Sequence, residues 1–169
     1  KMISLQENGA PDPFAETVRA LFREGGALSR ARGFEHRAPQ ERMAGEVAAA
    51  LVERRHLVIE AGTGVGKSLA YLLPAILHGV TQRRKAVVST HTIHLQEQLL
   101  HKDIPIARRI LPVNFNAALL KGRQNYLCPR RLRRALEQAA GLFTSTEHEE
   151  LTRIAEWARK TRDGTLSDF

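Results

Sequence analysis

Apolar positions along the chain follow two patterns, helix-like spacing and short continuous runs. Helix-like spacing, with apolar residues three and four positions apart, predicts a first helix that begins at Pro13 and is stopped by Gly25-Gly26. It also predicts helices over residues 39–54, 67–78, 92–101, 103–111, 130–140 and 147–160. Continuous apolar runs predict short buried strands over residues 57–60, 85–89 and 116–120. Because strands that alternate with helices pair in a parallel sheet covered on both faces, we predict an α/β fold.

The first two predicted helices carry boundary signals and apolar faces. Asp12 before Pro13 is typical of an N-cap followed by proline at the first helical position. Pro39 opens the second helix, which we expect to end near Arg54. The residues expected to face the core are Phe14, Val18, Leu21 and Phe22 in the first helix and Met43, Val47, Ala50 and Leu51 in the second.

The turn between the first predicted strand and the helix at 67–78 carries the clearest chemistry. It reads Ala61-Gly62-Thr63-Gly64-Val65-Gly66-Lys67-Ser68. Glycines that let the chain curl, followed by a helix N-terminus, build a nest of backbone N–H groups for a polyphosphate. Lys67 is expected to reach the β- and γ-phosphates, and the Ser68 hydroxyl to bind Mg²⁺. Ala61 stands where the usual motif has its first glycine, and a glycine-rich turn without a ligand is the alternative.

Composition narrows the class of partner. The chain has 169 residues and 43% hydrophobic content, enough for one core of ordinary domain size. Its formal net charge of +8 attracts polyanions such as nucleic acid or an anionic membrane surface, and a solvated basic surface without a partner is the alternative. Cys128 is the single cysteine, which excludes an internal disulfide. With no signal peptide or long apolar span in the sequence, we expect a cytoplasmic protein without a membrane partner.

Polar residues on both sides of the phosphate loop suit nucleotide and DNA contacts. Gln40 follows Arg37, and its amide, which donates and accepts at once, suits the edge of an adenine base. Thr90 and His91 directly follow the second predicted strand, and Gln96 lies in the next predicted helix. Hydroxyl groups and helix N-terminal N–H groups bind a nucleic-acid backbone without reading its sequence. An ordinary capped helix is an equal alternative for this segment.

A compact polar segment at residues 121–129 follows the third predicted strand. Arg123 is suited to a phosphate contact, and Tyr126 either stacks on a base or packs into the core. Cys128 before Pro129 fits a thiolate ligand at a chain turn, with a lone buried cysteine as the alternative.

Together these segments resemble the XPD/DinG family of ATP-dependent DNA helicases in superfamily two, and its bacterial DinG-like members in particular. The resemblance extends over roughly residues 12–169, and the order and spacing of its motifs make it specific. It rests on residues 34–40 with Met43, on residues 60–68, on residues 87–90 with 95–98, and on residues 122–128.

The resemblance implies a domain organisation and a set of roles. It implies a partial RecA-like phosphate-loop domain over residues 1–128 and the start of an inserted helical iron–sulfur and arch region over residues 129–169. ATP and Mg²⁺ would bind residues 61–68, with catalytic roles for Lys67 and Ser68. The members of the family couple ATP hydrolysis to 5′→3′ movement on single-stranded or forked DNA, in repair or replication stress. A monomer associated with the bacterial nucleoid is expected.

Roles also follow for the flanking residues. Gln40, with Arg37, would recognise adenine. The residues expected at DNA are Thr90, His91, Gln96, Arg123 and Tyr126. Cys128 would match the first of four cysteines that hold a [4Fe–4S] cluster.

The chain departs from the family pattern in what it lacks. It has no Asp-Glu pair, so the Asp-Glu-Ala-His box that organises Mg²⁺ and activates water is missing, as is the second motor domain. We therefore expect an N-terminal fragment that hydrolyses no ATP by itself. Two other classes stay open: a different phosphate-loop NTPase, and a non-catalytic nucleic-acid-binding module.

Overall fold

The computed structural model describes residues 12–30, 34–138, 141 and 144–169. It divides the chain into two compact units, Lys1–Leu119 and Leu120–Phe169. The sequence predicts a boundary after residue 128, between the motor domain and the inserted helical region. That boundary separates functional parts of the chain, whereas the two units here are defined by their contacts, so it stays a prediction.

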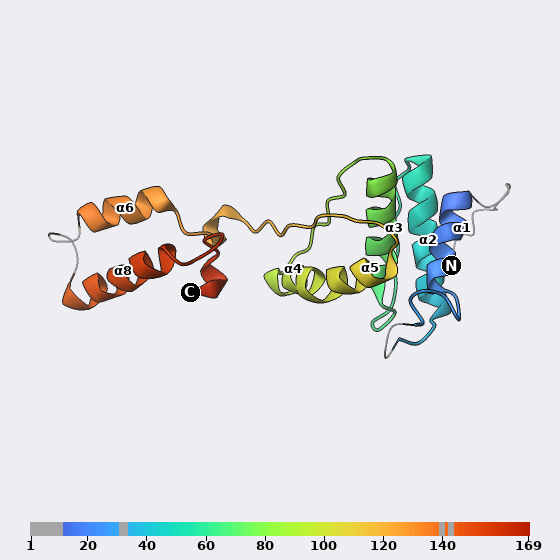
Figure 1. Cartoon of the computed structure of the whole chain (residues 1–169), viewed down its shortest axis with the longest axis horizontal. Coiled ribbons are helices and arrows are strands. Elements are labelled where there is room, and N and C mark those ends of the chain that lie inside the picture. The colour runs from blue at the N-terminus through green and yellow to red at the C-terminus, as the bar shows by residue number, and fades with distance from the viewer. Residues whose placement is uncertain (1–11, 31–33, 139–140, 142–143) are drawn as a thin grey trace. The chain divides into compact units, whose positions relative to one another are not determined.

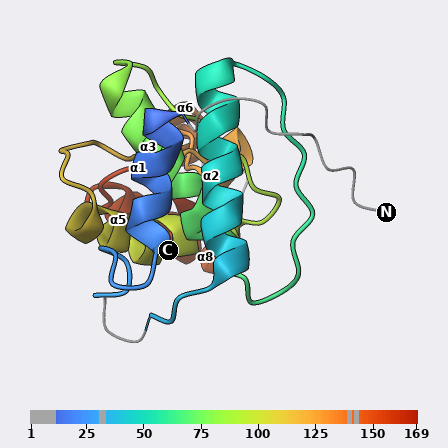
Figure 2. The ribbon, with the colours of Figure 1, turned by 90° about the vertical axis from the view of Figure 1, so that its right-hand side faces the viewer.

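Three neighbouring helices form the body of the first unit. They are α1 (Pro13–Phe22), α2 (Ala38–Glu53) and α3 (Lys67–Thr81). Helix α2 packs against both α1 and α3 (Figures 1 and 2). Helix α4 (Ile93–Gln98), a π-helical turn over Leu99–Asp103 and α5 (Ile104–Ile110) form one continuous helical run. The π-helical turn and α5 pack against α3. The phosphate loop at residues 61–66 therefore leads directly into a helix that is held from two sides.

The predicted start of the first helix is confirmed, and the helix ends at Phe22, shortly before the Gly25-Gly26 pair that was expected to stop it. The Asp12 side-chain Oδ1 accepts hydrogen bonds from the backbone N–H groups of Phe14 and Ala15, at 2.8 and 3.2 Å. Pro13 occupies the first turn, where its missing N–H costs nothing. This N-cap fixes where α1 begins.

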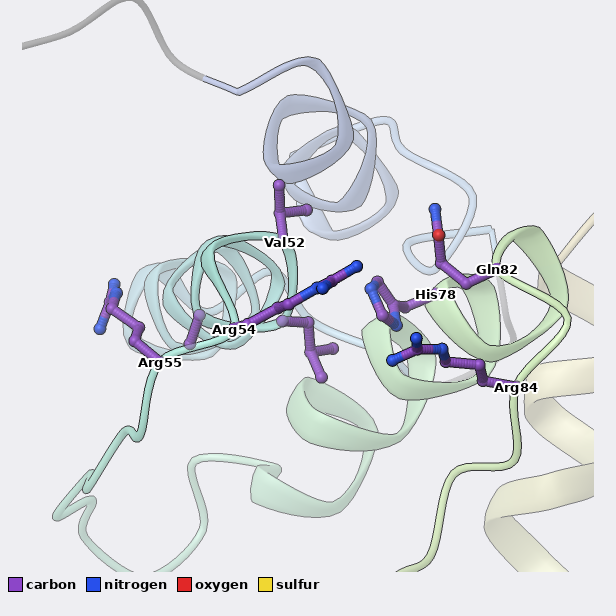
Figure 3. Close-up of a pocket in the computed structure, with 8 residues that line it drawn as sticks. Val52, Arg54, Arg55, His78, Gln82 and Arg84 are labelled. Carbon is purple, nitrogen blue, oxygen red and sulfur yellow. The ribbon is translucent and has the colours of Figure 1, made fainter.

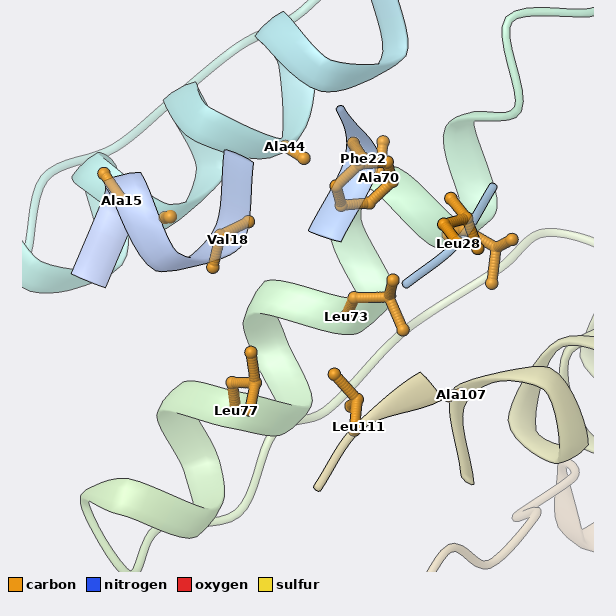
Figure 4. Close-up of a cluster of buried hydrophobic side chains, with 12 residues drawn as sticks. Ala15, Val18, Phe22, Leu28, Ala44, Ala70, Leu73, Leu77, Ala107 and Leu111 are labelled. Carbon is orange, nitrogen blue, oxygen red and sulfur yellow. The ribbon is translucent and has the colours of Figure 1, made fainter. Parts of the chain in front are cut away.

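The buried core of the first unit joins all of its long helices (Figure 4). Its members are Ala15, Val18, Phe22, Leu28, Ala44, Ala48, Leu69, Ala70, Leu73, Leu77, Ala107 and Leu111. The predicted face of α1 is present, since Val18 and Phe22 are buried and Phe14 and Leu21 pack against the core.

The face predicted for α2 needs correction. Ala50 is buried as predicted, and the other buried residues of α2 are Gln40, Ala44, Gly45 and Ala48. Met43, Val47 and Leu51 are only half-buried. Helix α2 packs against two neighbours, and small side chains allow that close approach. A Cβ on Gly45 would lie 2.3 Å from Nε of Arg19. The prediction followed the spacing of the large apolar residues, and therefore missed a buried face made mostly of small ones.

The predicted parallel sheet is wrong. Among the described residues no β-strand forms, and the one β-bridge is an isolated antiparallel pair between Tyr126 and Thr165. Residues 57–60, 85–89 and 116–120 form no strand, and the residues Val58, Val87 and Leu120 are 97%, 91% and 83% exposed. An apolar run satisfies only the local condition for a strand. A parallel ladder also needs a neighbour brought from far along the chain, which the run itself does not specify.

The second unit is a helical hairpin closed at its base. Helix α6 (Pro129–Glu137) packs against α8 (Ser145–Ala158), and both were expected from the pattern. The Tyr126–Thr165 bridge joins the two ends of the hairpin, together with a 2.8 Å hydrogen bond from the Leu127 N–H to the Gly164 carbonyl oxygen. Lys121 is also buried at the base of this hairpin, and its side-chain Nζ donates hydrogen bonds to the hydroxyls of Thr165 and Ser167, at 3.1 and 2.6 Å.

Within the described part of the chain, no helix is both long enough and apolar enough to cross a membrane.

Candidate nucleotide site

The phosphate loop takes a conformation that its glycines make possible. Gly64 and Gly66 have φ values of +78° and +82°, in the left-handed region that side chains rarely adopt. Gly66 is the N-cap of α3, so the N–H groups of the first turn face the loop. Residues 61–68 thus form a turn of flexible backbone at a helix N-terminus, which is the geometry of an anion site.

Lys67 holds the loop in a closed curve. Its side-chain Nζ donates hydrogen bonds to the carbonyl oxygens of Ala61 and Gly62, at 2.9 and 2.8 Å. The side chain is exposed, so its ammonium group exchanges these carbonyls for a stronger acceptor at little cost. A phosphate oxygen in the loop is such an acceptor.

The two residues expected at adenine both contact this loop. Gln40 is 1% exposed, and its Nε2 donates to the Gly66 carbonyl oxygen at 2.8 Å. Arg37, just before α2, donates from Nη1 to the carbonyl oxygen of Gly64. The structure therefore brings Arg37, Gln40 and the loop together. A glutamine amide keeps a second N–H and an oxygen beyond the hydrogen bond it makes here.

Ser68 has two neighbours that the sequence pattern did not single out. They are Tyr71, one turn along α3, and Asp103, at the end of the π-helical turn. Asp103 is 5% exposed, and its Oδ2 has no hydrogen-bond partner. Burial raises the pKa of Asp103, while hydrogen bonding from Gln98, the charge of Lys102 and hydrogen bonding from Ser68 act in the opposite direction.

Tyr71 responds to the same environment. Burial raises the pKa of the Tyr71 phenol, hydrogen bonding with Ser68 lowers it, and the Asp103 carboxylate raises it. No sequence signal pointed to Asp103. A single acidic residue between Lys102 and Ile104 is typical of an exposed position, and only the structure shows that this one is buried.

The residues expected at DNA belong to both units. In the first, the Thr90 hydroxyl donates to the Thr92 carbonyl oxygen at 3.1 Å, and the Thr92 hydroxyl caps α4 by accepting from the Leu95 N–H at 3.3 Å. His91 is exposed and Gln96 half-buried. This segment has the features of a capped helix, which leaves a DNA contact there as a prediction.

In the second unit, Arg123 is exposed and Tyr126 is half-buried. The Tyr126 hydroxyl oxygen accepts a hydrogen bond from the Lys121 backbone N–H at 2.9 Å. The phenol therefore has a structural contact at the base of the hairpin. A role for its ring in stacking stays a prediction.

Cys128 is exposed at the N-cap position of α6. Within the described ranges, no group of three or more His, Cys, Asp or Glu side chains gathers around a possible metal position. A [4Fe–4S] cluster takes four ligands, typically cysteine thiolates, and this chain has one cysteine, so its own residues do not fit a whole cluster.

A separate hollow of about 330 Å³ lies at the C-terminal ends of α2 and α3, away from the phosphate loop (Figure 3). Arg54 and Arg84 extend toward His78, whereas Arg55 points away (Figure 3) and pairs with Glu46 and Glu53. None of the predicted site residues lines this hollow. Basic side chains are stabilised at helix C-termini by the helix dipole, which accounts for their gathering without a ligand.

Comparison with known proteins gives a consistent family. Residues 41–156 match the family model described as DEAD/DEAH box helicase. The chain is 37% identical to the ATP-dependent DNA helicase YoaA of Haemophilus influenzae, over 92% of this chain and 24% of that protein. It is 42% identical to the ATP-dependent helicase DinG of Mycobacterium tuberculosis, over 82% of this chain and 23% of that protein.

A third relative carries a different name. The 3'-5' exonuclease DinG of Bacillus subtilis is 33% identical, over 81% of this chain and 14% of that protein. The chain thus spans a quarter or less of the length of each of these relatives.

Proposed function

Because the chain belongs to the DEAD/DEAH box helicase family and is DinG-like within it, we propose that it carries the nucleotide-binding segment of an ATP-dependent DNA helicase. The observation that carries the proposal is the conformation of the phosphate loop. The side chains of Lys67, Gln40 and Arg37 all donate hydrogen bonds to its backbone carbonyl oxygens.

ATP binding follows from an exchange of partners in this loop. The triphosphate enters the curve of residues 61–66, and the ammonium group of Lys67 moves from two carbonyl oxygens to the β- and γ-phosphates. The helix N-terminus adds N–H donors and a favourable dipole. Gln40, with Arg37, contacts the adenine base from the side of α2.

Mg²⁺ fits the residues present. Ser68 supplies a hydroxyl ligand at the first turn of α3, and the buried, incompletely satisfied carboxylate of Asp103 lies beside it. The ion would neutralise charge on the phosphates when bound with ATP. The protein's part is to hold the Ser68 hydroxyl in place.

Hydrolysis needs groups that these residues do not supply. The chain has no Asp-Glu pair, and hydrolysis in this family depends on a carboxylate that positions the attacking water. We therefore propose that the 169-residue chain binds nucleotide weakly and turns over none. Robust ATP hydrolysis by the purified chain would refute this.

The DNA part of the proposal rests on charge and on the names of the relatives. The net charge of +8 favours a polyanion, and Thr90, His91, Gln96, Arg123 and Tyr126 are the proposed contacts to single-stranded or forked DNA. A 5′→3′ direction, a role in repair or replication stress, a monomeric state and a nucleoid-associated cytoplasmic location belong to the same proposal.

Cys128 is proposed as one ligand of a [4Fe–4S] cluster whose remaining ligands come from residues outside this chain. No step of the reaction is derived through that cluster. The relative named as an exonuclease is matched over only 14% of its length, so it carries no argument for nuclease activity here.

Nucleotide binding separates the proposal from its alternatives. ATP should bind the chain in the presence of Mg²⁺, and single-stranded DNA should bind it in a salt-dependent way. A non-catalytic module with a vestigial loop would bind DNA without ATP. A small-molecule kinase would transfer phosphate to an acceptor and show no response to DNA.

A further inference from the structure

Asp103 owes its buried position to an irregularity in its helix. The helical run from Ile93 to Ile110 contains a π-helical turn at Leu99–Asp103, in which the Ile104 N–H bonds to the Leu99 carbonyl oxygen. A π-helical turn adds one residue and shifts the faces of the helix on either side of it, and such turns are frequent at functional sites. Asp103 and the next residue, Ile104, are both buried as a result.

Burial of this carboxylate is unfavourable for folding alone. A buried carboxylate loses its hydration, and an oxygen without a hydrogen bond adds to that loss. An apolar residue of similar volume would remove both costs. The position of Asp103 therefore points to a role other than packing.

Ser68 indicates what that role is. A hydroxyl group that gives a lone pair to a metal ion must direct its hydrogen elsewhere, and a carboxylate is the strongest acceptor for it. Asp103 is buried with its Oδ2 lacking a hydrogen-bond partner, and burial raises the pKa of its carboxyl while hydrogen bonding from Gln98 and from Ser68 lowers it. Hydrogen bonds from a metal ligand to a nearby carboxylate orient the ligand and tune its affinity for the metal.

We propose that Asp103 is a positioning residue for the metal–nucleotide site, which accepts the Ser68 hydroxyl hydrogen so that the hydroxyl oxygen faces Mg²⁺ bound to the triphosphate. This inference rests on the proposed function. It assigns a role to a carboxylate outside the phosphate-loop motif, and it needs no direct bond between Asp103 and the ion.

The test compares ATP affinity with Mg²⁺ and with EDTA, by NMR titration of the 169-residue chain. Asp103→Asn should weaken binding about tenfold with Mg²⁺, because a charged acceptor is lost, and change it less than about twofold in EDTA. In a Ser68→Ala background, Asp103→Asn should have no further effect, because both residues act through one contact. Asp168→Asn, which changes an exposed aspartate, is the control and should match the wild type.

An equal loss with and without Mg²⁺, or a full loss that persists in the Ser68→Ala background, would overturn the inference and leave the proposed function intact. Absence of ATP binding by the wild-type chain would overturn both. Asp103→Asn should unfold at no lower temperature than the wild type, since it removes a buried charge. Asp103→Leu, which has no acceptor, gives the same comparison if the asparagine variant does not fold.

Discussion

Gln40 donates a hydrogen bond from its buried side-chain Nε2 to the carbonyl oxygen of Gly66, at 2.8 Å. A Cβ added to Gly66 would lie 2.3 Å from that same nitrogen, and the residue has a φ of +82°. The contact thus ties α2 to the phosphate loop at a position where only glycine fits, both by space and by backbone conformation.

The first prediction concerns this glycine. Gly66→Ala should destabilise the chain by ~1–3 kcal/mol, because alanine is strained at this φ and displaces the Gln40 amide. The free energy of unfolding in urea measures it. Gly62→Ala is the matched control, since a Cβ there meets nothing within 4 Å and the residue has no positive φ. Equal losses in the two variants would contradict the account of the loop.

The second prediction concerns base recognition. Gln40→Ala should lower ATP affinity about tenfold, since it removes a contact to the loop and the group proposed to read adenine. It should also reduce the preference for ATP over GTP. Titrations with both nucleotides measure the ratio. If affinity falls equally for ATP and GTP, Gln40 positions the loop and does not read the base.

The third prediction concerns the pH dependence of α8. The backbone N–H of Thr144, and next its hydroxyl, donate to the exposed Glu147 carboxylate and hold its pKa below the ordinary 4.5. Because the folded pKa is lowered, this contact stabilises the folded chain above the ordinary pKa and is lost as pH falls through the folded pKa. Glu147→Gln should therefore lower the melting temperature at neutral pH and have little effect in strong acid.

Thermal unfolding followed by circular dichroism checks this dependence. Glu149→Gln is the control on the same helix, because Glu149 is exposed and lies outside the capping box of Thr144 and Glu147. A Glu147→Gln effect that persists unchanged in acid would rule out the carboxylate as its source.

The fourth prediction separates stability from DNA binding in the second unit. Tyr126→Phe removes the oxygen that accepts from the Lys121 N–H, so it should cost about 1 kcal/mol of stability while the ring remains for stacking. Arg123→Ala should leave stability unchanged and weaken binding to single-stranded DNA. The slope of log binding constant against log salt concentration should become shallower by about the value of one phosphate contact. Binding measured over a range of salt concentrations distinguishes the two. Unaltered DNA affinity in Arg123→Ala would remove that residue from the proposed contacts.

Local signals in the sequence were sufficient for the parts of the molecule that local chemistry determines. Asp12 and Pro13 fixed the start of α1, and the glycines with Lys67 indicated the loop that leads into α3. Residues 57–60 failed as a strand because pairing depends on distant partners that an apolar run does not specify. Asp103 was missed because its burial depends on a π-helical turn, which has no simple sequence pattern. The sequence predicted a nucleotide contact for Gln40, which stays a prediction, and did not indicate its hydrogen bond to Gly66.

The affinity of the chain for ATP with Mg²⁺, compared between the wild type and Lys67→Ala, tests the central claim most directly. Lys85→Ala is the control, because Lys85 is an exposed lysine outside the loop. The wild type and Lys85→Ala should show weak, saturable binding, and Lys67→Ala should lose about tenfold or more, since it removes the ammonium group that meets the phosphates. Equal ATP binding by Lys67→Ala and the wild type would contradict a nucleotide site at residues 61–68.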